Sequence, residues 1–254
     1  MSEEESWRSE AAYDYIDQLT TSDLAWEFLR RNPDYRIAFQ ELLSSGRLND
    51  ETATSFAEQW GCVFAADPRI TALAQPIFWT PQTDPAAIIL QTGPAPAEGS
   101  HLTVDDLRIH AVLQREAAQL RLDMNGVRFD LTLAGPIEDK ALAAVIPLDE
   151  LTPDRLTALG RFWAAAKGRP VSADPRMTPQ RHQRARQMLR AIDARHAGAI
   201  YRVVAEQLFP QHKIDAASWV GDPIREITIR LARDGMKLVR GGYRTLLRRP
   251  RRDR

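Results

Sequence analysis

The sequence predicts an α+β protein that is mostly α-helical. We expect a small helical N-terminal module, a small antiparallel β-sheet with a hairpin at Asn125-Gly126, and a C-terminal helical domain with a variant helix-turn-helix. Three observations support this fold class. Two runs of alternating apolar residues flank Asn125-Gly126, apolar residues recur at helical spacing from Thr152 onward, and prolines interrupt the chain between the helical regions. The expected domains are residues 1–60, 61–149 and 150–254.

The composition is that of a globular protein from a reducing compartment. The chain has 254 residues, of which 44% are hydrophobic, and its single cysteine, Cys62, excludes a disulfide framework and a thiolate metal cluster. The acidic first residues, MSEEESW, are unlike a signal peptide. No run approaches the roughly 18 apolar residues that a membrane-spanning helix needs. We therefore expect a cytoplasmic protein with no membrane partner.

The charges are segregated along the chain. Residues 151–254 hold 23 Lys and Arg against 9 Asp and Glu, a net charge of +14, and residues 1–150 carry a net charge of −14. So large a basic excess repels itself unless something neutralises it, which favours a polyanion such as double-stranded DNA as partner. A solvated basic surface without a partner is the alternative. The acidic half could also fold back on the basic half and mask it.

The N-terminal region has the pattern of a helical module. Apolar and aromatic residues recur over residues 6–45, and Thr21 or Ser22 can cap the helix that begins DLAWEFLRR. Asn32-Pro33 separates this helix from the next, because a residue before proline avoids the α region. Pro33 suits the first turn of the second helix. A third helix is predicted at residues 51–60.

The clearest β signal lies on either side of Asn125-Gly126. Apolar residues alternate with polar ones at Leu120, Leu122 and Met124, and again at Val127, Phe129, Leu131 and Leu133. Asn-Gly between two such runs predicts a hairpin, because a type I′ turn requires positive φ at both central residues. Strands at about 86–91 and 107–113 are expected to pair with this hairpin.

Four helices are predicted after residue 150. They begin at Thr152-Pro153, Thr178-Pro179, Ala199 and Asp222-Pro223. The last three run to about Arg195, Phe209 and Arg240. The residues expected to face the core are Leu156, Leu159, Phe162 and Trp163 in the first helix, Met188, Leu189 and Ile192 in the second, Tyr201, Val204, Ala205 and Leu208 in the third, and Ile224, Ile227, Leu231 and Leu238 in the fourth.

The fourth helix carries most of the candidate DNA-binding residues. At about 100° per residue, its apolar residues fall within about 60° of Ile224. The basic residues that fall together on the opposite face are Arg230, Arg233, Lys237 and Arg240, with Glu226 as the one acid among them. A helix that buries one face and lines the other with Arg and Lys suits contact with DNA phosphates. Two further candidates are Arg225 at the helix start, where arginine can reach base edges, and Arg244 beyond its end.

The third and fourth predicted helices suggest a helix-turn-helix with an unusual connection. The common turn has about 3–4 residues, whereas residues 210–221 separate these helices and Phe209 stands where a small residue is usual. The motif is therefore a variant. The arginines of the C-terminal tail, Arg248, Arg249, Arg251 and Arg252, either add phosphate affinity or form a solubilising end.

Parts of the sequence resemble known families. GAIYRVVAEQLFP and SWVGDPIREITIRLARDGMKLVRGGYRTLLR resemble the proteobacterial type VI secretion system transcription-factor DNA-binding domain, formerly a domain of unknown function. The residues that carry this resemblance are Tyr201, Ala205, Leu208, Phe209, Trp219, Arg225, Arg230, Leu231, Asp234, Gly235, Gly242, Tyr243 and Leu246. RFDLTLAGP and GRFWAAAKGRP are similar to the same family's leading hairpin and first helix. WRSEAAYDYIDQLTTSDLAWEFLRRNPDYR is similar to a proteobacterial transcriptional-regulator-like module often fused ahead of it. The resemblance implies bacterial transcription control, including regulators of mobile integrative elements.

Two other classes of function are weaker. The alternative to a DNA-binding regulator is an anti-activator that binds another transcriptional regulator. It is suggested by the acidic N-terminal half and its aromatic residues Trp7, Tyr13, Tyr15, Trp26, Phe28 and Tyr35, which are more simply a core. An enzyme, a cofactor and a metal are not expected, because P-loop, GxSxG and HExxH motifs are lacking and the histidines are scattered. A homodimer would suit paired DNA half-sites, although no heptad seam is present.

Overall fold

The computed structural model describes residues 6–48, 51–94, 101–115, 118–135 and 141–250, which form two compact units. The first unit comprises Met1–Ala53, Ala65–Ile77 and Pro175–Leu246. The second comprises Thr54–Phe64, Phe78–Asp174 and Leu247–Arg254. Each unit therefore joins segments that are far apart in the sequence. This grouping cuts across the three consecutive regions expected from the sequence, whose boundaries stay a prediction.

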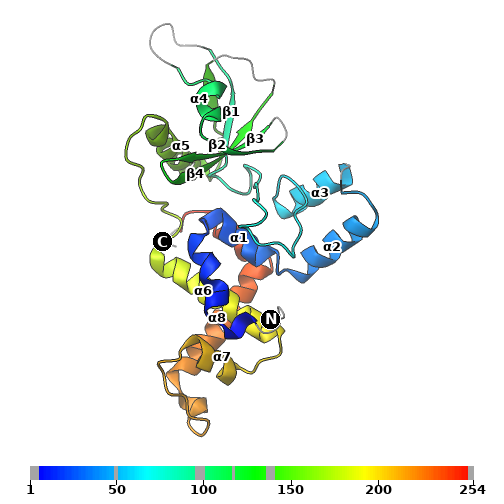
Figure 1. The fold of residues 1–254 in the computed structure, drawn as a ribbon, viewed down its shortest axis with the longest axis vertical. Coiled ribbons are helices and arrows are strands. Elements are labelled where there is room, and N and C mark those ends of the chain that lie inside the picture. Colours follow the sequence, from blue (N-terminus) through cyan, green and yellow to red (C-terminus); the bar gives the residue numbers. More distant parts are fainter. Residues whose placement is uncertain (1–5, 49–50, 95–100, 116–117, 136–140, 251–254) are drawn as a thin grey trace. The chain divides into compact units, whose positions relative to one another are not determined.

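The first unit is built from helices that come from both ends of the chain (Figure 1). Its N-terminal helices are η1 (Ser6–Arg8), η2 (Ala11–Gln18), α1 (Thr21–Leu29) and α2 (Pro33–Ser44), where η denotes a 3₁₀ helix. Its C-terminal helices are α6 (Pro179–His196), α7 (Tyr201–Leu208), η3 (Trp219–Gly221), α8 (Pro223–Val239) and η4 (Gly242–Thr245). A further helix, α3 (Glu51–Trp60), has residues in both units.

Local capping explains where these helices begin. Thr20 and Asp23 form a capping box at α1, so the cap lies one residue before the predicted Thr21. Asn32 caps α2 by accepting hydrogen bonds from Asp34 N at 2.8 Å and Tyr35 N at 3.1 Å, with Pro33 in the first turn. The same arrangement of cap and proline begins α6. The break predicted at Asn32-Pro33 is confirmed.

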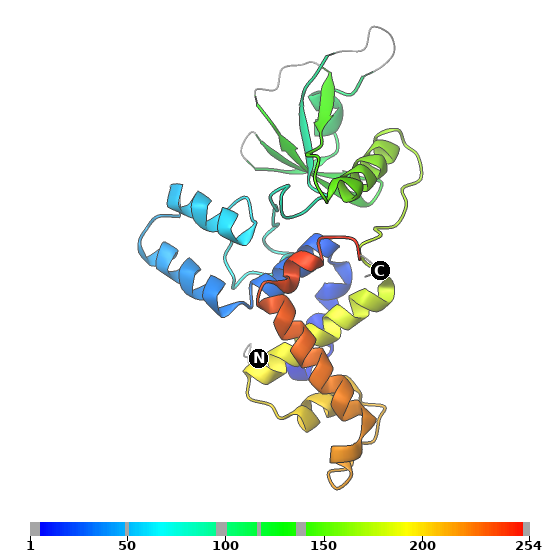
Figure 2. The same cartoon turned by 180° about the vertical axis from the view of Figure 1, so that it is seen from behind.

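Helices α6 and α8 pack closely against each other, and α1 packs on both (Figure 2). Gly235 of α8 is buried against Ile192 and Met188 of α6. A Cβ placed on Gly235 would lie 2.7 Å from Ile192 Cδ1 and 3.2 Å from Met188 Cβ. The lack of a side chain at Gly235 therefore permits the short distance between the two helices.

The N-terminal helices are attached to α6 by buried polar contacts. Asp193 accepts hydrogen bonds from Tyr13 Oη at 2.6 Å and from Arg31 Nε at 2.7 Å. Arg190 Nε donates to the Trp7 carbonyl at 2.8 Å. At a more exposed point, Arg186 of α6 pairs with acidic residues of η2. The acidic N-terminal segment thus meets arginines of α6.

The second unit contains a five-stranded sheet with the order β2-β3-β4-β1-β5. Its strands are β1 (Ile88–Thr92), β2 (Ala111–Arg115), β3 (Gln119–Met124), β4 (Val127–Leu133) and β5 (Leu142–Val145). Its helices are α4 (Val104–Arg108) and α5 (Thr152–Ala166). The sequence did not predict α4 or β5, and the strand expected at 107–113 begins only at Ala111.

The hairpin at the centre of the sheet has the predicted geometry. Asn125 and Gly126 have φ of 58° and 76°, and β3 and β4 pair antiparallel from Met124 with Val127. The strand predicted near residues 86–91 pairs with β4 in the parallel direction. The sheet is therefore mixed, whereas the sequence suggested an antiparallel one.

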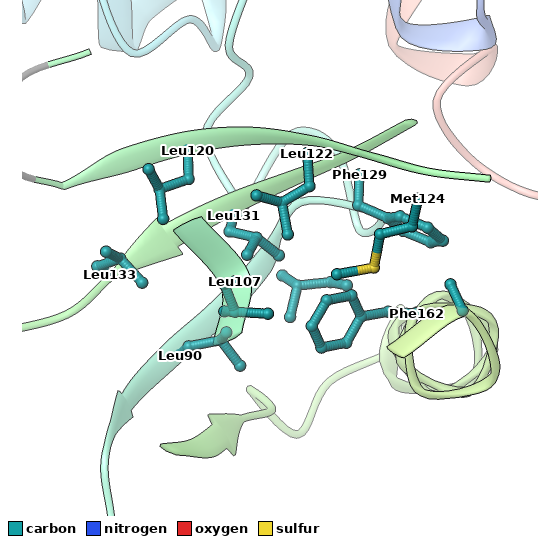
Figure 3. Packing of buried hydrophobic residues seen from close by; sticks show 11 residues of the cluster. Leu90, Leu107, Leu120, Leu122, Met124, Phe129, Leu131, Leu133 and Phe162 are labelled. Carbon is teal, nitrogen blue, oxygen red and sulfur yellow. The ribbon is translucent and has the colours of Figure 1, made fainter. Parts of the chain in front are cut away.

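One face of the sheet carries the hydrophobic core of the second unit (Figure 3). Leu107 of α4 and Phe162 of α5 pack among the leucines of the strands, and the rings of Phe129 and Phe162 lie edge to face at 5.6 Å. Leu156 and Trp163, which were expected in this core, are 53% and 45% exposed. The buried residues of α5 are instead Arg155, Ala158, Phe162 and Ala165, so the buried face of this helix is rotated from the predicted one.

Candidate DNA-binding surface

The start of α8 is fixed by the cap that the sequence predicted. Asp222 Oδ1 accepts a hydrogen bond from Ile224 N at 2.8 Å, and Pro223 occupies the first turn. His212 of the connector lies with Nε2 3.0 Å from Asp222 Oδ2. The bond from Ile224 N and the contact with His212 lower the pKa of Asp222. The cap therefore ties the helix start to the connector before it.

The buried face of α8 is rotated around the helix relative to the predicted one. Its buried residues are Thr228, Leu231, Ala232, Gly235 and Val239. Ile227 was expected in the core but is 42% exposed. The reason is the close contact at Gly235, which centres the buried face on small residues. Thr228 is accommodated there because its hydroxyl donates to the Ile224 carbonyl at 2.8 Å.

The face of α8 opposite to the buried one is basic and exposed. The exposed residues there are Arg230, Arg233, Lys237 and Arg240, together with Glu226, and we call the four cations the α8 stripe. At a rise of about 1.5 Å per residue, the stripe spans roughly 15 Å, or about four base-pair steps of DNA. Among the described residues, Arg233 has one ion pair, at 3.3 Å with Asp234, which is its neighbour in the chain. So weak an exposed pair leaves Arg233 available to a phosphate.

The other predicted site residues do not join the α8 stripe. Arg225 is half-buried near the helix start, on the flank of the exposed face. Arg244 follows Gly241, whose φ of 112° turns the chain, and its guanidinium lies 4.9 Å from the centre of the Tyr243 ring. In the tail, Arg249 N donates to Asp154 Oδ2 at 3.2 Å. Arg251 and Arg252 lie outside the described residues.

A cation that the sequence did not single out lies beside the stripe. Arg184 of α6 donates from Nη2 to Asp234 Oδ2 at 2.8 Å, and its side chain is 43% exposed. Asp234 thus stands between Arg184 and Arg233. Only the packing of α6 on α8 brings Arg184 to this place, so no pattern within one helix could have identified it.

The connector between α7 and α8 is longer than the turn of a usual helix-turn-helix, so the motif is a variant. Helices α7 and α8 pack against each other, with Val204 and Ala205 of α7 buried. The connector contains the 3₁₀ turn η3. Trp219 is half-buried in it, and Val220 is 83% exposed. The long connection therefore has structure of its own.

The aromatic residues of the N-terminal module form a core. Trp26, Phe28 and Tyr35 are fully buried, and Trp7 and Tyr13 are 2% exposed. Trp26 Nε1 donates to the Ile70 carbonyl at 3.1 Å, and Tyr35 Oη to the Ala66 carbonyl at 2.7 Å. These rings are thus buried inside the first unit, so they give no evidence for a surface that binds another protein.

A capped helix with one buried face and one basic, exposed face is an element that one class of protein uses, the nucleic-acid-binding domains. Comparison with protein families agrees with this class. Residues 145–248 match the family described as "T6SS, Transcription factor, DNA binding domain". Residues 6–65 match the "Proteobacterial transcriptional regulator-like domain". Both resemblances that the sequence suggested are confirmed, in the expected order, although RFDLTLAGP lies outside both matched ranges. The names of the two families indicate a bacterial transcriptional regulator with a DNA-binding domain.

Further findings bear on the class of protein. Families of transcriptional regulators and DNA-binding domains are in general not enzymes. Within the described ranges, no helix combines the length and the hydropathy that crossing a membrane requires. Among curated proteins, none matches the chain significantly.

Proposed function

We propose that this regulator binds double-stranded DNA in the cytoplasm through the α8 stripe, with α8 as its recognition helix. The observation that carries the proposal is the exposure of all four stripe cations on the face opposite to the α6 contact. Guanidinium and ammonium groups in such a row can neutralise successive phosphates and release counterions. Arg225 lies nearer the helix start, where an arginine could reach a base edge.

The neighbouring residues support the same function. Arg184 adds a cation next to the stripe, and the half-buried Asp234 orients the Arg184 guanidinium through its bond at 2.8 Å. Arg240 and Arg244 extend the basic surface beyond the end of α8. The acidic residues of η2 pair with Arg186 on α6, so their charge is directed at α6 and the stripe stays exposed.

Substitution of single stripe residues tests this function. Arg230→Ala and Arg233→Ala should each weaken binding of duplex DNA by about tenfold, the effect of losing one charge-assisted contact. The helix should remain folded because both side chains are exposed. Fluorescence anisotropy with labelled duplexes and circular dichroism measure the two properties.

The matched control is Arg47→Ala, which removes one exposed arginine from the N-terminal module of the same unit. It should leave DNA affinity within about twofold, because the stripe is intact. Equal losses for Arg47→Ala and Arg233→Ala would mean that net charge alone sets the affinity. Absence of DNA binding by the unaltered protein would refute the function.

A further inference from the structure

The first unit contains a second basic feature, a cleft of about 310 Å³ between the N-terminal helices and the end of α6. It is lined by Ser6, Arg30, Arg31, Arg36, Asp193, His196 and Ala197. Its volume is at the lower end of small-molecule sites, which suits a compact metabolite. Arg36 is on α2 and His196 is on the last turn of α6. An occupant of the cleft would therefore contact both the N-terminal and the C-terminal helices of the first unit.

The buried side chains of this cleft form a rigid base. Arg31 is held by Asp193 through two hydrogen bonds, Nε to Oδ1 at 2.7 Å and Nη2 to Oδ2 at 2.8 Å, and its Nη1 donates to Glu27. Arg30 Nε donates to Glu27 Oε2 at 2.6 Å. The two carboxylates are therefore occupied by Arg30 and Arg31. Because Asp193 and Glu27 balance two of the three arginines, one net positive charge remains.

The donors that remain unused lie at the opening of the cleft. Arg36 is exposed, and its one hydrogen bond within the described residues is from Nε to the Arg30 carbonyl at 3.0 Å, which orients the guanidinium. Nη1 and Nη2 of Arg36 are thus left for a ligand, as is Nη2 of Arg30. His196 is exposed beside them and makes no hydrogen bond to another described residue.

We propose that this cleft binds the phosphate group of a small metabolite. A fork of guanidinium donors on a fixed base matches the geometry of phosphate oxygens, and a dianion gains more from the surplus positive charge than a monoanion does. The group binds between Arg36 and His196, with Arg30 behind them. The site is separate from the α8 stripe, whose residues do not line the cleft.

His196 provides a reporter for this site. Although part of the His196 side chain reaches solvent, the surrounding residues shield the imidazole from water and so lower its pKa. The charges of Arg31 and Arg36 lower the pKa of His196 further, against the opposing effect of Asp193. A phosphate placed against the imidazole stabilises its protonated form, so the pKa of His196 should rise on binding. The experiment is a titration of the full chain with inorganic phosphate, followed by NMR of the histidine rings at constant ionic strength. His196→Gln identifies the His196 resonance.

The His196 resonance should move in a saturable manner while that of His212, beside Asp222, follows no such curve. Arg36→Gln should weaken phosphate binding by about tenfold, whereas Arg47→Gln and the stripe variant Arg233→Ala should leave it unchanged. Acetate should bind more weakly than phosphate. A His196 shift that does not saturate, equal affinity in Arg36→Gln, or acetate binding as tight as phosphate would each overturn the proposal.

Discussion

At the scale of single residues, Asp193 connects the two ends of the chain within the first unit. Its carboxylate accepts from Arg31 twice and from Tyr13 once, and its side chain is 19% exposed. Burial alone would raise the pKa of Asp193, but the charge of Arg31 and the bonds from Arg31 and Tyr13 outweigh it and hold the pKa below its usual range. Burial and the same carboxylate raise the pKa of Tyr13, so the hydroxyl stays protonated and donates.

Asp193→Asn should lower the free energy of unfolding by about 3 kcal/mol, because it leaves Arg31 partly uncompensated in a buried place. The folded-state pKa of Asp193 is below its unfolded value of about 3.9, so its contribution is complete above that value and is lost as pH falls through the folded pKa. Urea unfolding between about pH 7 and 2 measures both effects. The unaltered protein should lose stability on acidification more steeply than Asp193→Asn. Parallel curves for the two proteins would contradict this role.

At the scale of elements, the contact between α6 and α8 determines which face of α8 reaches solvent. Gly235 lets α8 approach Ile192, and the stripe lies on the far side as a consequence. Gly160 of α5 is a useful contrast, because, apart from its chain neighbours and the nearby backbone of its own helix, no described atom lies within 4 Å of the position of its Cβ. One helical glycine is therefore required by packing and the other is not.

Alanine at these two glycines should have opposite effects. Gly160→Ala should stabilise α5 by about 0.5–1 kcal/mol, the usual gain for alanine over glycine in a helix. Gly235→Ala gains the same amount but forces Ile192 and Met188 to move, which costs about 1–3 kcal/mol. Amide hydrogen exchange should therefore slow in α5 of the Gly160→Ala variant and accelerate in α8 of the Gly235→Ala variant. If exchange slowed equally in the two variants, Ile192 and Met188 of α6 would be able to move without a cost in free energy.

The elements that the sequence predicted well are those with local signals. Asn32-Pro33 and Asp222-Pro223 mark helix starts by capping, and Asn125-Gly126 marks the hairpin by its backbone conformation. The stripe was predicted for the same reason, since helical periodicity fixes which residues share a face. The exposure of Ile227, the strand β5 and the contribution of Arg184 depend on which segments meet in space. A pattern within one segment contains no information about tertiary contacts between segments that are distant in the sequence.

At the scale of the whole molecule, the segregation of charge has a more specific consequence than the sequence suggested. Part of the N-terminal acidity is paired with arginines: Asp14 and Asp17 contact Arg186 of α6, whereas Glu27 contacts Arg31 of the N-terminal module itself. The four stripe cations are exposed in the part of the chain that the structure describes. The acidic residues of η2 therefore contribute to the assembly of the first unit and leave the four stripe cations uncovered.

The salt dependence of DNA binding tests the central claim most directly. If the four stripe cations each neutralise one phosphate, log K should fall against log salt with a slope of about −4, and the double variant Arg233→Gln/Lys237→Gln should show a slope of about −2. The exposed control Arg47→Gln should keep the slope of the unaltered protein. Anisotropy titrations over a range of salt concentrations give these slopes. A slope that the double variant leaves unchanged, or an affinity that does not depend on salt, would contradict the assignment of DNA binding to the α8 stripe.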